Sequence, residues 1–271
     1  MTRLPPGATV TPEVAGWRHL SFHTADLDDR PLQVGDPEQE IALVTLDGGA
    51  TVLTRDGARF ELPGRTSVWD GLPWALYLPA GTSATATAVG EGGATVALAS
   101  APSRGHGSSE PILIGPDDVR VEVRGAGNAT RQINHIITPD FPADRLEVVE
   151  VYTPSGNWSS WPPHKHDTDA MPQEAVLEEI YHYRFRRTEA WGVQRLYGGS
   201  LDGLWPVRDG ETVIVRDGYH PFVATHGDDA YYLNALAGDA RTMACSFDPA
   251  LAPVMDAWPA LELDPRLPLV Q

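Results

Sequence analysis

The stretch Pro162-Pro163-His164-Lys165-His166-Asp167 is followed further along the chain by Leu177-Glu178-Glu179-Ile180-Tyr181. Alternate residues of a β-strand point to the same face, so a strand here directs His164 and His166 to one side. Two imidazoles on one face can bind the same ion. The stretch therefore predicts a β-rich fold with a metal site.

The remaining metal ligands are expected on neighbouring strands. Strand alternation puts Glu178 and Glu179 on opposite faces, so only one of them can share the ion. Similarity to cupins selects Glu179, because the cupin ligand stands just before a hydrophobic and aromatic run. His220, in Gly218-Tyr219-His220-Pro221, is expected as the fourth ligand, with His226 as the alternative. Such a set suits zinc, iron, manganese or nickel.

The rest of the chain predicts an all-β protein. Short apolar or alternating runs, such as residues 41–46, 50–54 and 75–78, are separated by turns rich in Gly, Asp and Pro. The 26 Gly and 24 Pro favour many short strands over long helices. We therefore expect antiparallel strands in barrels or sandwiches, with few short helices.

Both halves carry a cupin-like signature. Residues 78–84, Leu-Pro-Ala-Gly-Thr-Ser-Ala, fit the Pro-x-Gly-x-x-His turn of a cupin, but Ala84 stands where the histidine would be. We predict two tandem jelly-roll-like cupin barrels: residues 1–120 without metal ligands, and residues 121–271 with the metal and the catalytic site. A Gly/Ser-rich connection at 103–109 precedes the boundary.

Charge and cysteine content limit the partners. The net charge of −17 would repel nucleic acid and anionic lipid. No run approaches the length of about 18 apolar residues that a membrane span requires. The single cysteine, Cys245, allows no disulfide within the chain, which favours a cytoplasmic location. A small sugar acid is the expected ligand, and a homo-oligomer is compatible with the sequence.

Positive charge is supplied almost entirely by arginine, since Lys165 is the only lysine. Arg can bind a carboxylate through two parallel hydrogen bonds. Arg195 is the candidate anchor for a substrate carboxylate, and Arg131 is a second candidate.

Several long motifs resemble the 5-deoxy-glucuronate isomerase family of bacterial inositol catabolism. They are residues 124–128 (Arg-Gly-Ala-Gly-Asn), 155–167, 177–185, 218–221 and 231–238 (Tyr-Tyr-Leu-Asn-Ala-Leu-Ala-Gly). The resemblance implies a metal-dependent aldose–ketose isomerase that converts 5-deoxy-D-glucuronate to 5-dehydro-2-deoxy-D-gluconate. A related uronate ketol-isomerase implies one divalent ion per chain, zinc before manganese or iron, held by His164, His166, Glu179 and His220.

Such a reaction needs either a general base that moves a proton or a metal-assisted hydride shift. The candidates for the base are Glu178, Glu174, Tyr232 and a hydroxide held by the metal. Twelve residues separate His166 from Glu179, more than in a typical cupin, so residues 167–176 are expected to loop out over the pocket. The alternatives are another cupin metalloenzyme, such as a related ketol-isomerase or an iron dioxygenase, and a non-catalytic sugar-binding bicupin.

Overall fold

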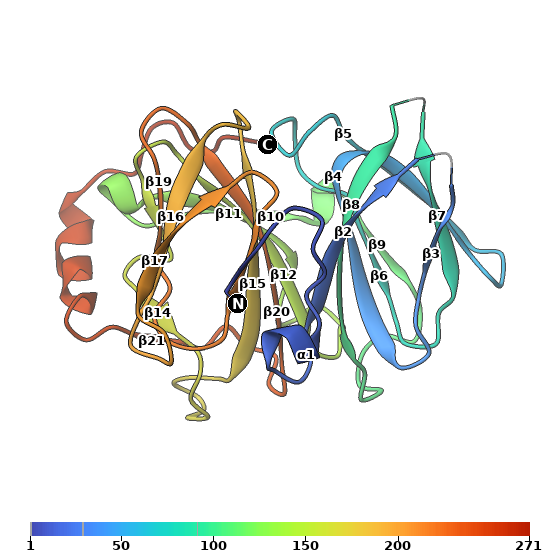
Figure 1. Cartoon of the computed structure of the whole chain (residues 1–271), viewed down its shortest axis with the longest axis horizontal. Helices are drawn as coiled ribbons and strands as arrows, with labels where there is room; N and C mark the ends of the chain where they lie inside the picture. Colours follow the sequence, from blue (N-terminus) through green and yellow to red (C-terminus); the bar gives the residue numbers. More distant parts are fainter. Residues whose placement is uncertain (1, 29, 91) are drawn as a thin grey trace.

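The computed structural model describes residues 2–28, 30–90 and 92–271, which form two β-rich halves side by side (Figure 1). The predicted all-β, jelly-roll-like architecture is confirmed. Each half is a sandwich of facing sheets, and neither closes into a continuous hydrogen-bonded barrel. Among the described residues, no helix has the length and apolar character needed to span a membrane.

Within the described residues, helical structure is confined to four short segments. These are α1 (Pro12–Ala15) and the 3-10 segments η1 (Pro116–Asp118), η2 (Gly127–Ala129) and η3 (Ala252–Ala260).

Strands account for most of the regular secondary structure. The strands before residue 115 are β1 (Arg3–Leu4), β2 (Ser21–Leu27), β3 (Leu32–Val34), β4 (Gln39–Thr54), β5 (Arg59–Arg65), β6 (Ala75–Leu78), β7 (Ala84–Val89), β8 (Ala94–Pro102) and β9 (Ile112–Ile114). Those after it are β10 (Arg120–Arg124), β11 (Arg131–Ile137), β12 (Leu146–Thr153), β13 (Trp158–Ser159), β14 (His164–Lys165), β15 (Leu177–Phe185), β16 (Trp191–Leu196), β17 (Gly203–Arg208), β18 (Thr212–Val215), β19 (Phe222–Ala224), β20 (Ala230–Gly238) and β21 (Ser246–Phe247).

The inner sheets of the two halves correspond strand for strand. The N-terminal order is β2-β8-β4-β6-β9, and the C-terminal sheet contains β12-β20-β15-β18-β1 with β11 and β10 added beyond β12. Strand β4 is long because its first part pairs with β6 and β8 while its second part pairs with β5 and β7. A β-bulge near Thr45 lies between the two parts.

The first strand crosses between the halves. Strand β1 pairs with β18 at the edge of the C-terminal sheet, whereas β9, which leads into the second half, pairs with β6 at the edge of the N-terminal sheet. The predicted boundary at residue 120 stays a proposal, and sheet membership does not follow it, because Arg3 and Leu4 complete the C-terminal sheet.

Three large apolar clusters and one small one stabilise this arrangement in the described part of the chain. One fills the N-terminal sandwich and one fills the C-terminal sandwich. The third lies between the inner sheets and combines residues such as Phe22 and Val44 with Val148, Ile180 and Leu233. Because burial of apolar area drives folding, this shared cluster makes the halves mutually dependent.

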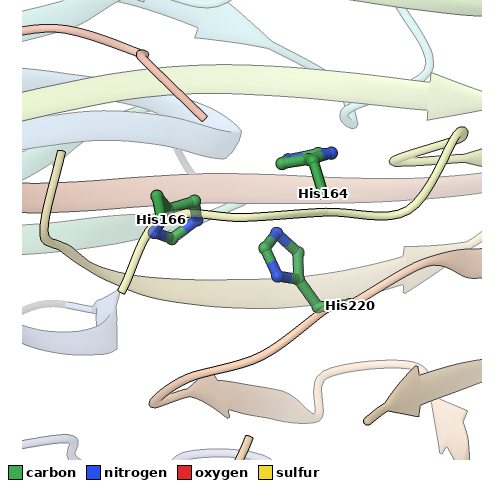
Figure 2. A group of neighbouring side chains, drawn as sticks. All are labelled: His164, His166 and His220. Carbon is green, nitrogen blue, oxygen red and sulfur yellow. The ribbon is translucent and has the colours of Figure 1, made fainter. Parts of the chain in front are cut away.

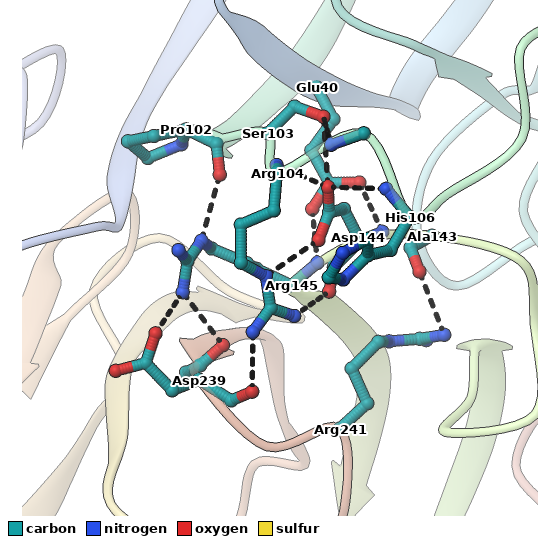
Figure 3. Close-up of polar contacts among 12 residues, drawn as sticks. Glu40, Pro102, Ser103, Arg104, His106, Ala143, Asp144, Arg145, Asp239 and Arg241 are labelled. Atoms are coloured by element: carbon teal, nitrogen blue, oxygen red, sulfur yellow. Dashed lines mark hydrogen bonds and ion pairs between the residues drawn. The ribbon is translucent and has the colours of Figure 1, made fainter.

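A polar network closes one end of the shared interface (Figure 3). Glu40, which is fully buried on β4, accepts the backbone N–H groups of Asp144, Arg145 and Leu146 at 2.6–2.8 Å. Asp144 pairs in turn with Arg104, and Arg145 with Asp239. The start of β12 is therefore held by a carboxylate from the other half.

Candidate active site

Three histidines and a glutamate converge inside the C-terminal sandwich (Figure 2 shows the histidines). His164 lies on β14, His166 directly follows it, and His220 lies in the turn between β18 and β19. One ring nitrogen of each lies within 4.8 Å of the others. Glu179 Oε2, from β15, is 2.8 Å from His166 Nε2 and 3.2 Å from His220 Nε2.

Backbone carbonyls orient two of the imidazoles. His166 Nδ1 lies 2.9 Å from the carbonyl oxygen of Leu177, and His220 Nδ1 lies 2.9 Å from that of Gly218. A carbonyl can only accept, so each Nδ1 carries the hydrogen, and each neutral ring directs an Nε2 lone pair toward the centre. In the described part of the chain, His220 Nε2 is buried and has no hydrogen-bond partner.

Glu179 is oriented in the same way. Its Oε1 accepts a hydrogen bond from Asn234 Nδ2 at 2.6 Å, which leaves Oε2 directed at the histidines. A carboxylate oxygen that faces imidazole lone pairs at these distances requires a cation between them, either a proton or a metal ion. The donor set therefore fits a divalent metal.

The electrostatics agree with this requirement. Burial alone would raise the pKa of Glu179, but His220 and His166 outweigh it and lower that pKa to about 2. Burial lowers the pKa of His164 and of His220, whereas Glu179 outweighs burial and raises the pKa of His166. A cation is thus favoured between Glu179 and His166, and a metal ion that replaced a proton there would bind an ionised carboxylate beside neutral imidazoles. Three nitrogens and one oxygen suit zinc, manganese or iron.

The equivalent positions of the N-terminal half carry apolar side chains. Glu179 pairs with Val215 at the end of β18, and in the corresponding strands Ile41 pairs with Leu78 at the end of β6. Ile41 therefore stands where Glu179 does, and Ala84 stands after the turn where His220 does. Neither side chain offers a ligand atom.

A cavity of about 390 Å³ opens beside the histidines. Its walls come from β10, β11, β12, β15 and β20, together with β21 and the η3 segment. His164, His166 and Glu179 lie on its wall, as do Tyr232 and Arg131. This volume is within the usual range for small-molecule sites.

Tyr232 is the candidate proton-transfer residue that the cavity contains. It is buried, and its ring packs against that of Tyr181 with centroids 4.5 Å apart. Burial raises the pKa of Tyr232, so its hydroxyl carries a proton at neutral pH.

Two sequence-predicted site residues lie elsewhere. Glu178 is on the opposite face of β15, where it accepts the backbone N–H groups of Arg18, His19 and Leu20 at 2.5–2.8 Å. Strand alternation directs the Glu178 carboxylate toward the other half and away from the cavity. Glu178 is therefore not placed to act as the base. Arg195 does not line the cavity, because its side chain pairs with exposed Asp202 at 3.1 Å and packs over the Tyr197 ring.

The segment after His166 also differs from expectation. Residues 167–176 do not line the cavity. Lys165 Nζ donates to Thr168 and Glu174 at 2.7 and 2.8 Å and pairs with Asp167, while Glu174 accepts the backbone N–H groups of Asp167 and Thr168. The segment is thus a locally bonded loop, and Glu174 is engaged within it.

Sequence reasoning missed two polar groups near the ligands. Asn234 lies two residues after Tyr232 on β20, so strand alternation could have placed it on the same inner face. Cys245, considered above only for disulfide formation, is partly buried and lines the cavity. Burial raises the pKa of its thiol to about 11, which keeps it protonated.

Two jelly-roll halves in one chain, with a single histidine-rich centre found in the part that the structure describes, define a bicupin. The chain belongs to the KduI/IolB family, whose model matches residues 5–254. It is 40% identical to a 5-deoxy-glucuronate isomerase of Geobacillus kaustophilus, over 89% of this chain and 87% of that protein. It is 37% identical to the Bacillus subtilis (strain 168) protein of the same name, over 79% of each.

Solved structures agree with this assignment. An IolB-like protein from Salmonella typhimurium superimposes with a TM-score of 0.89 and 34% identity, covering 94% of this chain and 99% of that one. An oxalate decarboxylase from Lactobacillus farciminis has a TM-score of 0.62 at 13% identity over 91% of this chain and 88% of that one, so it shares the fold alone.

Proposed function

We propose that the protein is a 5-deoxy-glucuronate isomerase that works with one divalent metal ion, zinc in preference to manganese or iron. The observation that carries the proposal is the position of His164, His166, Glu179 and His220 beside a cavity of small-molecule size. The names of the relatives, which align over most of the chain, support the substrate.

The reaction moves the hydrogen on C2 of the sugar to C1 and the proton of the C2 hydroxyl to the oxygen on C1, which converts the C1 aldehyde to an alcohol and the C2 alcohol to a ketone. A bound divalent ion would polarise the carbonyl and the neighbouring hydroxyl. The three histidines and Glu179 would hold that ion, and Asn234 keeps Glu179 Oε2 directed at the histidines. The apolar side chains of Val149, Val151 and Leu236 form part of the cavity wall and limit the access of water to the reacting carbons.

Tyr232 supplies a proton in this proposal. Among Glu178, Glu174 and Tyr232, only Tyr232 lines the cavity. Its protonated hydroxyl is suited to donate to the aldehyde oxygen as negative charge develops there. Replacement by phenylalanine would remove the donor and preserve the ring that packs on Tyr181.

The test is turnover of 5-deoxy-glucuronate by purified, metal-analysed protein, followed by NMR of the ketone carbon. Metal-depleted protein should be inactive, and activity should return with added zinc, manganese or iron. Glu179→Gln should lose both metal and turnover, and Tyr232→Phe should keep the metal and lose turnover. Binding of the sugar without product, or turnover only with oxygen, would contradict the proposal.

A further inference from the structure

We propose that Arg131 binds the carboxylate of the substrate and sets the preference for a sugar acid over a neutral sugar. This inference rests on the proposed function, because it assigns one end of the substrate to a residue of the same cavity. It concerns the end of the sugar remote from the reacting carbons.

Arg131 is a buried cation at the wall of the cavity. It opens β11, is 7% exposed, and shares the cavity-facing side of that strand with Ile133 and His135. Among residues 2–28, 30–90 and 92–271, no carboxylate lies within 4.0 Å of its guanidinium. A buried charge without a partner is costly, so an anionic ligand in the cavity would be strongly favoured.

Most of the guanidinium is free to bind that ligand. Within the described residues only Nη1 donates hydrogen bonds, to the carbonyl oxygens of Trp161 at 3.2 Å and Ala129 at 3.4 Å. Nε and Nη2 remain as the parallel donors that match the two oxygens of a carboxylate. Burial lowers the pKa of Arg131 to about 10, which still leaves it charged at pH 7.

The glycine turn before β11 holds this side chain in place. A Cβ atom on Gly125 would lie 2.0 Å from the carbonyl oxygen of Ala129 and 3.1 Å from Arg131 Nη1. Gly125 also has φ +108°, a conformation that favours glycine. The Arg124-Gly-Ala-Gly-Asn128 motif therefore lets the backbone approach the guanidinium and fixes its orientation.

The other arginines near the site are neutralised. Arg124 lines the cavity but donates Nε and Nη2 to Glu122 at 2.7 and 2.9 Å. Arg195 is paired with Asp202 outside the cavity. In a chain with a net charge of −17, an unpaired buried guanidinium is the feature that can attract an anionic sugar.

The test compares 5-deoxy-glucuronate with its uronamide, which has the same shape without the charge. Wild type should prefer the acid at least 10-fold in kcat/KM. Arg131→Gln should lower kcat/KM for the acid by about 100-fold and leave that for the amide within about 3-fold. Arg131→Lys keeps the positive charge but lacks the two parallel donors of the guanidinium, so its kcat/KM for the acid should lie between those of wild type and Arg131→Gln. Arg195→Gln should have the kcat/KM of wild type for both compounds.

Melting temperature and bound metal are measured for every variant, so that loss of folding is recognised. If Arg131→Gln does not fold, the acid-to-amide ratio of kcat/KM in Arg131→Lys tests the inference. An acid preference retained without the Arg131 guanidinium would overturn the inference. If wild type converts neither compound, the proposed function fails, and glucuronate is titrated calorimetrically into zinc-loaded wild type and the Arg131 variants. Binding lost only in the Arg131 variants supports the carboxylate site, and equal binding overturns it.

Discussion

Glu40 and Glu178 occupy equivalent positions in the two halves, and each accepts three consecutive backbone N–H groups from the opposite half. Glu40 on β4 binds residues 144–146 at the start of β12, and Glu178 on β15 binds residues 18–20 just before β2. The two carboxylates thus make a reciprocal connection about an internal pseudo-twofold axis. This relationship gives Glu178 a structural role beside Glu179, the proposed metal ligand.

Glu178→Gln should destabilise the protein and leave the metal in place. An amide offers one acceptor where the carboxylate offers two, and its NH₂ would face backbone donors. The loss should be about 3 kcal/mol in the free energy of unfolding, measured by denaturant titration. Glu40→Gln is the matched control and should behave alike. If Glu178→Gln lost its metal at unchanged stability, the assignment of strand faces on β15 would be reversed.

Asn234→Ala should weaken metal binding by about 10- to 100-fold, because the amide that directs Glu179 Oε2 is removed. Competition with a chelator measures the affinity. Asn134→Ala makes the same truncation at a buried site that faces the interface, where Asn134 contacts Gln132 and Glu150. It should lower stability and keep wild-type affinity. Equal affinities in both variants would count against the role of Asn234.

The stability of the protein should depend on Glu147 between about pH 4 and pH 7. This side chain is 1% exposed, and in the described structure no cation lies within 4.0 Å of it. Burial raises the pKa of Glu147 to about 7, against the opposing effect of Arg241 and, more weakly, of His166. The folded state therefore keeps a proton that the unfolded state has lost, and this contribution to stability decreases as the pH rises through that window.

Glu147→Gln should remove this dependence. The variant should match wild type near pH 4 and be more stable above pH 7, by up to about 3 kcal/mol. Urea unfolding at several pH values gives the comparison. A constant difference between variant and wild type across the range would show that the pKa of Glu147 is the same in the folded and unfolded states, contrary to the prediction.

Lys165→Met should increase the mobility of residues 167–176 and should not cause loss of the bound metal. The ammonium group is the common partner of Asp167, Thr168 and Glu174, and Asp167 Oδ2 accepts the N–H of Gly218 next to the His220 turn. Hydrogen exchange should speed up in this loop and at Gly218, with turnover reduced less than 10-fold. Exchange unchanged from wild type would mean that the loop is held by its backbone contacts alone.

Strand alternation predicted that His164 and His166 share a face and that only one of Glu178 and Glu179 can join them. The resemblance to cupins and to the isomerase family was needed to select Glu179 and to prefer His220 over His226.

Neither strand alternation nor the resemblance could separate Arg131 from Arg195, because the pairing of Arg195 with Asp202 and the burial of Arg131 depend on tertiary packing. The role of Glu178 could not be predicted either, since its partners are backbone N–H groups that precede β2. Every residue except proline has such a group, so the sequence does not indicate which ones will bind a given carboxylate.

Strand β1 and its pairing could not be predicted from the sequence for a related reason. Two residues, Arg3 and Leu4, give no periodic pattern, and their partner strand lies in the other half. Pairing over such a distance is determined by the completed sheet and not by local preference.

The position of β1 also bears on how the molecule is made. Arg3 is translated long before its partner Val213. The sheet that carries Glu179 therefore takes its edge strand from a segment that precedes the N-terminal half. Its last strand pairing can form only after that half has been synthesised.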